Sequence, residues 1–367
     1  MDFRKFKEID WKLLVIVSLI FILGIIVISS ATQANIVGIN RQVKVQFISF
    51  LMGLCIIFGL LLIDYNTFAK YSRPIYIVNI LLLLLVYMPG LGIQRAGARS
   101  WINLGFVDLQ TSEIVKIGFI LSFASFLEDK KGKLNTFRDL MPVALYAAPI
   151  VLLILKQPDL GTAIVFVSII SGMVFICDIN IKIVFYTMAA SVLSIPAIYP
   201  FLKAHQKLRI DAFLHPGNPD YAGNYQVIQS MIAIGSGKIF GKGLYKGTQN
   251  QFNFLPVQDT DFIFAVMGEE LGLIGGLMLI ILFYMLLKRI LTIAKTSKDF
   301  YGSLITTGVL FMFLYQTIQN IGMTMGLMPV TGVTLPFVSY GGSSMINSMI
   351  ALGIVFNVAM RRKKINF

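Results

Sequence analysis

The sequence is poor in histidine, cysteine and charge. Its 367 residues include two histidines and two cysteines, and only 13% are Asp, Glu, Lys or Arg. His205 and His215 share one polar stretch without an HExxH-like pattern, which argues against a zinc hydrolase. Cys55 and Cys177 lie in or beside apolar runs without a CxxC partner, so we expect both to be small core residues. An average soluble domain carries about a quarter charged residues. The deficit excludes a fold built around one water-soluble core.

Long apolar runs take the place of the missing charge. Hydrophobic residues make up 56% of the chain, the mean hydropathy is +0.78, and the runs are about 17 to 25 residues long, enough to cross roughly 30 Å of hydrocarbon. The runs lack the two-residue alternation of an outer-membrane barrel, and backbone groups in hydrocarbon must be satisfied within each segment. We therefore predict an all-α, polytopic integral membrane protein that forms a single domain over residues 1–367. About ten transmembrane helices are predicted, at residues 11–31, 46–64, 74–91, 112–128, 142–156, 161–177, 182–201, 262–287, 304–322 and 340–360.

Lysine and arginine predict how the chain is oriented. They gather in DKKGKLNTFRD, at Lys288 and Arg289, and in the terminal RRKK, and the positive-inside rule places these segments in the cytoplasm. Both termini are therefore predicted to be cytoplasmic. The first run lacks a small-residue cleavage site, so we expect a retained anchor. Topology and contact with anionic membrane lipids account for most of the net charge of +13, and no nucleic-acid partner is invoked.

One connection is large. Residues 202–260 form an extracytoplasmic loop between the seventh and eighth predicted spans, and loops longer than about 15 residues are usually functional or disordered. This loop is too apolar for disorder. Val227, Met231 and Ile234 recur at three- and four-residue spacing, which predicts a short helix lying on the membrane surface. The loop is also net positive, against the positive-inside trend. Either an anionic ligand or attraction to lipid head groups explains that charge.

Two pairs of charges lie at or near membrane depth, where each ionisable group costs about 2.5 to 3.5 kcal/mol on insertion scales. Glu113 and Lys116 are three residues apart in the fourth predicted span and share one helix face. They predict either a structural ion pair that fixes helix packing or a polar site open to the outer leaflet. Lys156 and Asp159 flank the break KQPDLG between the fifth and sixth spans, which is either a site of exposed charges or a capped turn.

The densest group of acids lies at the start of the eighth predicted span. Asp259 and Asp261 come just before it, where Asp259 or Thr260 is expected to cap the helix, and Glu269 and Glu270 follow about two turns deeper. At 1.5 Å per residue, Glu269 lies about 12 Å below Asp261, too far for a shared acid and base pair. We therefore expect Asp261 to act at the membrane surface and the two glutamates to brace the bundle.

The last connection, GLMPVTGVTLPFVSYGGSS, is rich in glycine, proline and hydroxyl residues. Its glycines permit tight turns and the close approach of a ligand to the backbone. Its amides and its hydroxyls, Ser339 and Ser343 among them, predict either a surface that binds phosphate or sugar or a plain re-entrant turn.

Several of these strings together resemble the SEDS family of cell-wall proteins (shape, elongation, division and sporulation), most closely its rod-shape branch. The matching strings run in order from about residue 92 to the end of the chain: GARSWINLG, SEIVK, QPDLGTA, YQVIQSMIAIGSG, GKGLYKGTQ, TDFIFAVMGEELG and PVTGVTLPFVSYGGSS. Ten spans with a large outer loop after the seventh are also the architecture of the family. The chain departs from the family pattern LPExHTDF at Val257 and Asp259 but keeps the aspartate of TDFIF.

The resemblance implies a peptidoglycan glycosyltransferase of the bacterial cytoplasmic membrane. Such an enzyme polymerises lipid II, the undecaprenyl-pyrophosphate-linked disaccharide, at the outer face of the membrane for cell elongation and rod shape, and pairs with a class B penicillin-binding transpeptidase. Carried over by motif, Asp261 is the catalytic residue. The substrate-binding residues implied are Arg99, Glu113, Lys116, Lys156, Asp159, Gln226, Gln229, Ser339 and Ser343. A divalent cation, Mg²⁺ or Mn²⁺, is compatible with a pyrophosphate leaving group, although no dedicated ligand set is visible in the sequence.

Two other classes of function stay open. Charges and helix breaks inside the membrane also fit a flippase or transporter of lipid-linked precursors. A noncatalytic scaffold that positions a transpeptidase would need neither activity.

Overall fold

The structure is a computed structural model. It describes residues 9–32, 40–88, 91–95, 98–103, 108–180, 182–187, 189, 193, 199–201, 204–215, 218, 221, 224–252 and 254–362.

Helices correspond to nine of the ten predicted spans. They are α1 (Trp11–Ala31), α2 (Arg41–Leu62), α4 (Ser72–Leu85), α5 (Thr111–Glu128), α6 (Phe137–Lys156), α7 (Leu160–Phe175), α12 (Ile263–Lys295), α13 (Phe300–Thr324) and α14 (Gly342–Arg361). In the seventh predicted span, 182–201, residues 182–187 are helical, and residues 188, 190–192 and 194–198 lie outside the described residues. Among the described helices, six are long and apolar enough to cross a membrane, and α4 and α7 are shorter apolar helices. The polytopic, mainly helical membrane fold is thereby confirmed.

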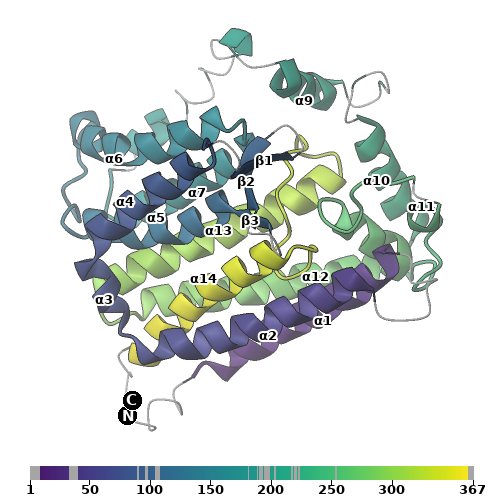
Figure 1. Ribbon diagram of the computed structural model, residues 1–367, viewed down its shortest axis with the longest axis horizontal. Helices are drawn as coiled ribbons and strands as arrows, with labels where there is room; N and C mark the ends of the chain where they lie inside the picture. Colours follow the sequence, from purple (N-terminus) through teal and green to yellow (C-terminus); the bar gives the residue numbers. More distant parts are fainter. Residues whose placement is uncertain are drawn as a thin grey trace.

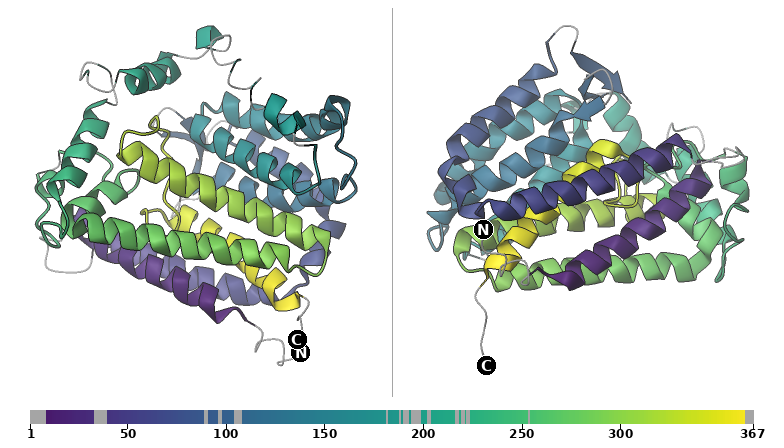
Figure 2. Two further views of the ribbon diagram at one scale, coloured as in Figure 1. Left: turned by 180° about the vertical axis from the view of Figure 1, so that it is seen from behind. Right: turned by 60° about the horizontal axis from the view of Figure 1, so that its bottom comes forward.

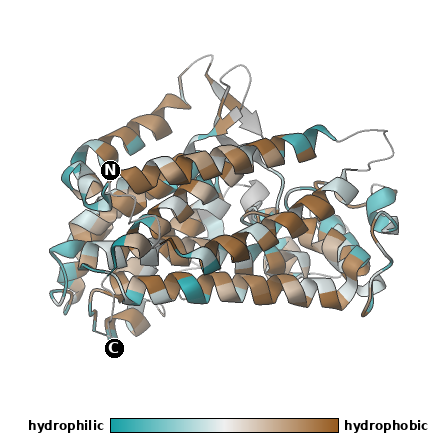
Figure 3. Cartoon of the chain, turned by 90° about the horizontal axis from the view of Figure 1, so that it is seen from below, coloured by the Kyte–Doolittle hydropathy of each residue, from teal (hydrophilic) through white to brown (hydrophobic). Residues whose placement is uncertain are grey.

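The long helices form one bundle in which α1 begins and α14 ends at the same end (Figure 1). We call this end the terminal end. The opposite end, where α1, α4, α6 and α13 finish and α5, α7, α12 and α14 begin, is called the site end. Helix α14 packs along α2 and also contacts α5, α12 and α13 (Figure 2). Hydrophobic colour covers most of the long helices in Figure 3, and hydrophilic colour gathers at their ends and in the connections.

Short elements complete the fold. The helix α3 (Tyr65–Lys70) lies at the terminal end. The 3₁₀ helix η2 (Tyr199–Phe201) lies at the end of the seventh predicted span, and α9 (Ala204–Leu214), α10 (Asn224–Ser236) and α11 (Thr248–Gln251) follow it. The strands β1 (Gly92–Arg95), β2 (Ala98–Asn103) and β3 (Asp108–Gln110) form an antiparallel sheet in the order β1-β2-β3, with Trp101 opposite Ile93 on one side and Gln110 on the other. This sheet is absent from the sequence prediction, because strands of three to six residues leave too short a pattern beside runs of twenty.

The two cysteines differ. Cys177 is buried, as predicted. The prediction of a core position for Cys55 is wrong, since this residue is exposed on α2. It lies one helical turn from the exposed residues Leu51 and Phe58, on the face of α2 that points away from the bundle.

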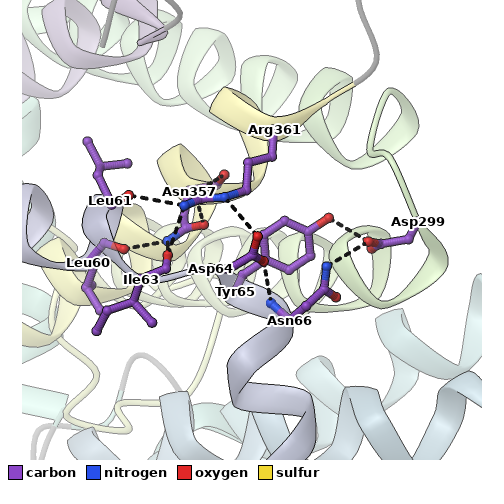
Figure 4. Close-up of polar contacts among 9 residues, drawn as sticks. All are labelled: Leu60, Leu61, Ile63, Asp64, Tyr65, Asn66, Asp299, Asn357 and Arg361. Carbon is purple, nitrogen blue, oxygen red and sulfur yellow. Dashed lines mark hydrogen bonds and ion pairs between the residues drawn. The ribbon is translucent and has the colours of Figure 1, made fainter. Parts of the chain in front are cut away.

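Polar side chains tie α2, α3, α13 and α14 together at the terminal end (Figure 4). The Arg361 guanidinium of α14 lies 3.3 Å from the Asp64 carboxylate and donates to carbonyl oxygens at the end of α2. Asn357, one turn earlier, donates to carbonyl oxygens of the same turn. The Tyr65 hydroxyl donates to the Asp299 carboxylate, which caps α13, at 2.7 Å. The free carbonyl groups where α2 ends are therefore satisfied by α14.

At the site end, α12 is interrupted at Gly272, whose φ of 66° is outside the helical range. The backbone groups freed by this break bond to the preceding loop. Lys242 and Gly243 donate their N–H groups to the carbonyl oxygens of Glu269 and Glu270, both at 3.0 Å. On the other side of the break, the N–H groups of Leu273 and Ile274 donate to the carbonyl oxygens of Lys238 and Ile239. The segment 238–243 is thus joined to α12 by main-chain bonds, which satisfy groups that would otherwise be unpaired near the membrane.

Close packing of glycine makes this junction possible, and we expect Gly237→Ala to destabilise the protein. A Cβ at Gly237 would collide with the carbonyl oxygen of Gly268, a backbone atom that no change of rotamer can move away. Thermal unfolding of the detergent-solubilised protein should show a midpoint several degrees below wild type, in line with a cost of about 1 to 3 kcal/mol for overpacking. Gly235→Ala is the matched control, because a Cβ there meets no atom within 4 Å. Equal midpoints for the two variants would contradict this packing argument.

Candidate active site

Asp261 lies in the turn that precedes α12. The N-cap position of α12 is Phe262, and no side chain caps the helix there. The prediction that Asp259 or Thr260 caps α12 is therefore wrong. The reason is local: the turn that enters the helix, with Val257 at a φ of 56°, continues to Phe262, two residues beyond Thr260, before helical geometry begins.

The segment 329–341 holds this turn from the side. The Ser339 hydroxyl donates to the Thr260 carbonyl oxygen at 2.6 Å and accepts from the Leu335 N–H at 2.9 Å. The Tyr340 N–H donates to the Asp259 carbonyl oxygen at 2.9 Å. We call the turn 257–262 together with the segment 329–341 the Asp261 cradle. Because Ser339 is buried and its hydroxyl serves two backbone groups, its geometry is that of a support for the turn, and a substrate contact through it stays a prediction.

A glycine lies directly beside the acid. Gly332 has a φ of +71°, and a Cβ built on it would lie 3.6 Å from Asp261 Oδ2. The left-handed backbone at this point brings the main chain of the segment close to the carboxylate without a side chain between them. Gln46 of α2 supports the far end of the segment, since its amide donates to the Ser339 carbonyl oxygen and accepts from the Gly341 N–H.

The surroundings of Asp261 favour its neutral form. Burial raises the pKa of its carboxyl to about 6, and the neighbouring Asp259 adds to the rise. The positive charge of Arg209, from α9, and a hydrogen bond from Thr260 act in the opposite direction. A carboxyl with a pKa near neutrality is suited to take up a proton during a reaction and to release it afterwards.

We expect activity that depends on Asp261 as a base to fall at acid pH. With a pKa of about 6, the carboxylate form predominates above pH 6 and is lost as the pH falls through that value. The rate should therefore drop about tenfold for each pH unit well below 6. Values of kcat/KM measured between about pH 4.5 and 8, which report the free enzyme, would show this limb. A flat profile down to pH 4.5 would exclude a base with this pKa.

A second polar group lies at the site end, where α5, α7 and α14 meet. Lys116 Nζ lies 2.7 Å from Glu113 Oε1, and the Asn347 side chain of α14 donates to Glu113 Oε2 at 3.0 Å. Both members of the ion pair are buried. The carboxylate of Asp159 caps α7 and accepts from the Thr162 N–H at 3.0 Å and from the Thr162 hydroxyl at 2.8 Å. The capped-turn interpretation of KQPDLG is correct for this residue.

Asp159 also belongs to the second polar group. Burial raises the pKa of its carboxyl, and its bonds to Thr162 lower it. The positive charge of Lys116 also lowers this pKa, and the negative charge of Glu113 raises it. The Asp261 cradle is in contact with α7, the helix that Asp159 caps, because Gly161 of α7 packs directly against the Thr331 carbonyl oxygen. The two polar groups therefore share one end of the bundle and are connected through the first turn of α7.

Other predicted residues lie apart from these groups or cannot be placed. Lys156 is exposed, with its Nζ 5.5 Å from the centre of the Tyr87 ring. Gln226 and Gln229 are half-buried on α10, and Ser343 lies in the first turn of α14. Arg99 belongs to β2, but its side chain lies outside the described residues. Substrate contacts by these five residues stay predictions.

Helix α10 confirms the predicted helical spacing but not the predicted setting. It packs against α12 and α13, and its buried Ser230 donates to the Thr324 carbonyl oxygen at 2.7 Å. Ile234 faces Gly268 of α12. One face of this helix packs against the bundle, and its position on the membrane surface stays a prediction.

The two glutamates of α12 brace the bundle, as predicted. Glu269 Oε1 accepts from Lys242 Nζ at 2.7 Å and from the Gln249 N–H at 3.0 Å. Glu270 Oε1 accepts from the Ser30 hydroxyl of α1 at 2.6 Å and from the Asn250 amide at 3.1 Å. The partners on α1 and in the loop were not predictable, because nothing local marks them. Within the described residues, no three His, Cys, Asp or Glu side chains converge on a position for a metal ion.

These observations define a class: a polytopic α-helical membrane protein that holds, at one end of its bundle, a half-buried aspartate in a backbone cradle and a buried lysine–glutamate pair. A family model for the FtsW, RodA and SpoVE cell cycle proteins matches residues 10–364, and the chain belongs to this family. The resemblance to the SEDS family is thereby confirmed.

Relatives cover nearly the whole chain. Stage V sporulation protein E of Bacillus subtilis (strain 168) is 36% identical over 362 residues, which cover 95% of this chain and 96% of that protein. Peptidoglycan glycosyltransferase MrdB of Escherichia coli (strain K12) is 35% identical, with 98% and 95% covered. A chain from a solved peptidoglycan synthase complex, described as coordinating polymerization and crosslinking, superposes with a TM-score of 0.82 at 30% identity, with 96% and 97% covered.

Proposed function

We propose that this chain is a peptidoglycan glycosyltransferase that polymerises lipid II into glycan strands for cell elongation and rod shape. The observation that carries the proposal is the position of Asp261, half-buried at the site end and flanked by the main chain of Gly332. The family membership and the activity named for relatives such as MrdB support it.

The chemistry needs one base. A lipid pyrophosphate is already a good leaving group, so the proton-donating carboxyl of a glycosidase is not required. The 4-hydroxyl of the acceptor sugar gives its proton to the Asp261 carboxylate while its oxygen bonds to the anomeric carbon of the donor. The bond from that carbon to the pyrophosphate breaks, the anomeric centre is inverted, and undecaprenyl pyrophosphate leaves with the electron pair. Asp261 then returns the proton to water.

Cations at the site end stabilise the departing charge. Lys116 lies in the second polar group, which is next to α7, and the first turn of α7 packs against the cradle. The positive charge of Arg209 acts on the Asp261 carboxyl itself. We assign Lys116, together with Arg99, to the pyrophosphate. Glu113 and Asn347 orient Lys116 for this task.

The proposal includes an orientation and a partner. The terminal end carries Arg289 and Arg361, and the positive-inside rule puts it in the cytoplasm. The site end then faces outward, where lipid II is used. We also propose a class B penicillin-binding transpeptidase as the partner, because a chain with the same fold belongs to a peptidoglycan synthase complex.

Reconstitution into liposomes with labelled lipid II separates the three candidate functions. A polymerase makes long glycan without a second transferase, and this is the expected result. A flippase moves labelled lipid between leaflets and forms no new glycosidic bond. A scaffold does neither but binds the transpeptidase. Either of the last two outcomes would overturn the proposal.

A further inference from the structure

One buried amide bonds to both parts of the Asp261 cradle, the turn 257–262 and the segment 329–341. Asn320, in the last two turns of α13, has no exposed surface. Its Nδ2 donates to the Asp261 carbonyl oxygen at 3.0 Å and to the Val333 carbonyl oxygen at 2.9 Å. These two carbonyl groups belong to segments that are 72 residues apart in the sequence. This side chain thus joins Asp261 of the turn to Val333 of the segment, in addition to the bonds that Ser339 and Tyr340 make to the turn.

The backbone at Asp261 has few other anchors. The turn precedes α12, whose N-cap makes no side-chain hydrogen bond. The bonds from Ser339 and Tyr340 reach Thr260 and Asp259, whereas the amide of Asn320 bonds to the main-chain oxygen of Asp261 itself. Val333, on the opposite side, is next to Gly332, which lies against the carboxylate.

We propose that Asn320 is a positioning residue for the glycosyl transfer: it holds the Asp261 carboxylate at the distance from residues 331–333 at which it takes the proton of the acceptor. This inference rests on the proposed function. Asn320 touches no reacting atom and acts through the backbone of Asp261. A displacement of about 1 Å at a catalytic group can cost a hundredfold in rate.

Loss of the amide also changes the surroundings of the acid. The charged groups that face Asp261 are Arg209 of α9 and Asp259 of the same turn, and neither contacts Asn320 through a hydrogen bond in the described residues. When residues 331–333 move away from Asp261, water reaches the carboxylate and its burial decreases. The acid limb of the pH profile then moves to lower pH.

The experiment compares Asn320→Ala with Gln319→Ala in the liposome assay. Gln319 is the neighbour on α13, and its amide donates to the Pro329 carbonyl oxygen at 2.8 Å, so it ties down the same segment without reaching Asp261. For Asn320→Ala we expect kcat to fall about 30- to 100-fold, KM for lipid II to change less than about threefold, and the acid limb to move down by about half a pH unit or more. For Gln319→Ala we expect less than about a threefold loss and an unmoved acid limb.

Two further variants keep the test decisive if Asn320→Ala fails to fold. Asn320→Asp has the same shape but lacks the amide donor, and Asn320→Ser keeps one hydroxyl donor. Activity should fall in the order wild type, Ser, Asp. Wild-type kcat and an unmoved acid limb in Asn320→Asp, or equal losses in Asn320→Ala and Gln319→Ala, would overturn the inference. If the wild-type chain itself forms no glycan, it is the proposed function that fails.

Discussion

Asp261→Asn is expected to abolish glycan synthesis and to leave the protein folded. Asparagine has the size of aspartate and keeps the main-chain bond of residue 261 to Asn320, but its amide cannot accept the proton of the acceptor hydroxyl. A general base of this kind contributes about 10²- to 10⁴-fold to a rate, so the residual activity should be at or below one part in a hundred. The measurement is polymer formation from labelled lipid II in liposomes, with thermal unfolding of the same preparation to show that the fold is intact.

Asp259→Asn is the matched control for this experiment. Asp259 lies two residues earlier in the same turn, and the Tyr340 N–H reaches its main-chain oxygen rather than its side chain. We expect its activity to stay within about threefold of wild type, the size of effect typical of a residue outside the transition state. Glycan synthesis by Asp261→Asn at the wild-type rate would remove Asp261 from the mechanism.

Lys116→Met is expected to reduce both stability and activity. Lys116 and Glu113 are buried and 2.7 Å apart, and removal of one partner leaves the other charge without compensation. The cost of breaking such a pair is about 3 to 5 kcal/mol. The same change removes a cation that we assign to the pyrophosphate. Thermal unfolding midpoint and polymerisation rate should therefore fall together in this variant.

The double variant Glu113→Gln with Lys116→Met separates the two roles of the pair. Replacing both members removes the unpaired charge, and a neutral pair of similar volume is often as stable as the ion pair it replaces. We expect the unfolding midpoint to recover and the polymerisation rate to stay low. Recovery of both quantities would show that the pair acts only in helix packing. That result would decide between the two alternatives that the sequence leaves open for this pair.

Spans and charged residues could be predicted from the sequence because both carry their signal locally. A run of twenty apolar residues marks a helix in hydrocarbon by itself, and a charge such as Glu113 or Lys116 at membrane depth is conspicuous by its cost. Asp261 could be found in the same way, as an acid at the mouth of a span. The small sheet gave no comparable signal, because its strands are short and their pairing depends on the turns between them.

The supports of the site could not be predicted, because they depend on contacts between distant segments. Asn320, Asn347 and Gln46 are uncharged amides within helices, and such residues have no cost that distinguishes a structural from a functional position. The break in α12 was missed for a related reason. The bonds that satisfy it come from residues about thirty positions earlier, and a glycine within an apolar helical run does not by itself mark a break.

That break has an evolutionary consequence. Four main-chain bonds join residues 238–243 to the two sides of Gly272, and main-chain atoms are the same whatever the side chains are. Substitutions at the exposed positions Ile239 and Phe240 should therefore be readily tolerated during divergence. An insertion or deletion of one residue would shift every bond out of register, so relatives should preserve the length of this stretch even where its composition has drifted.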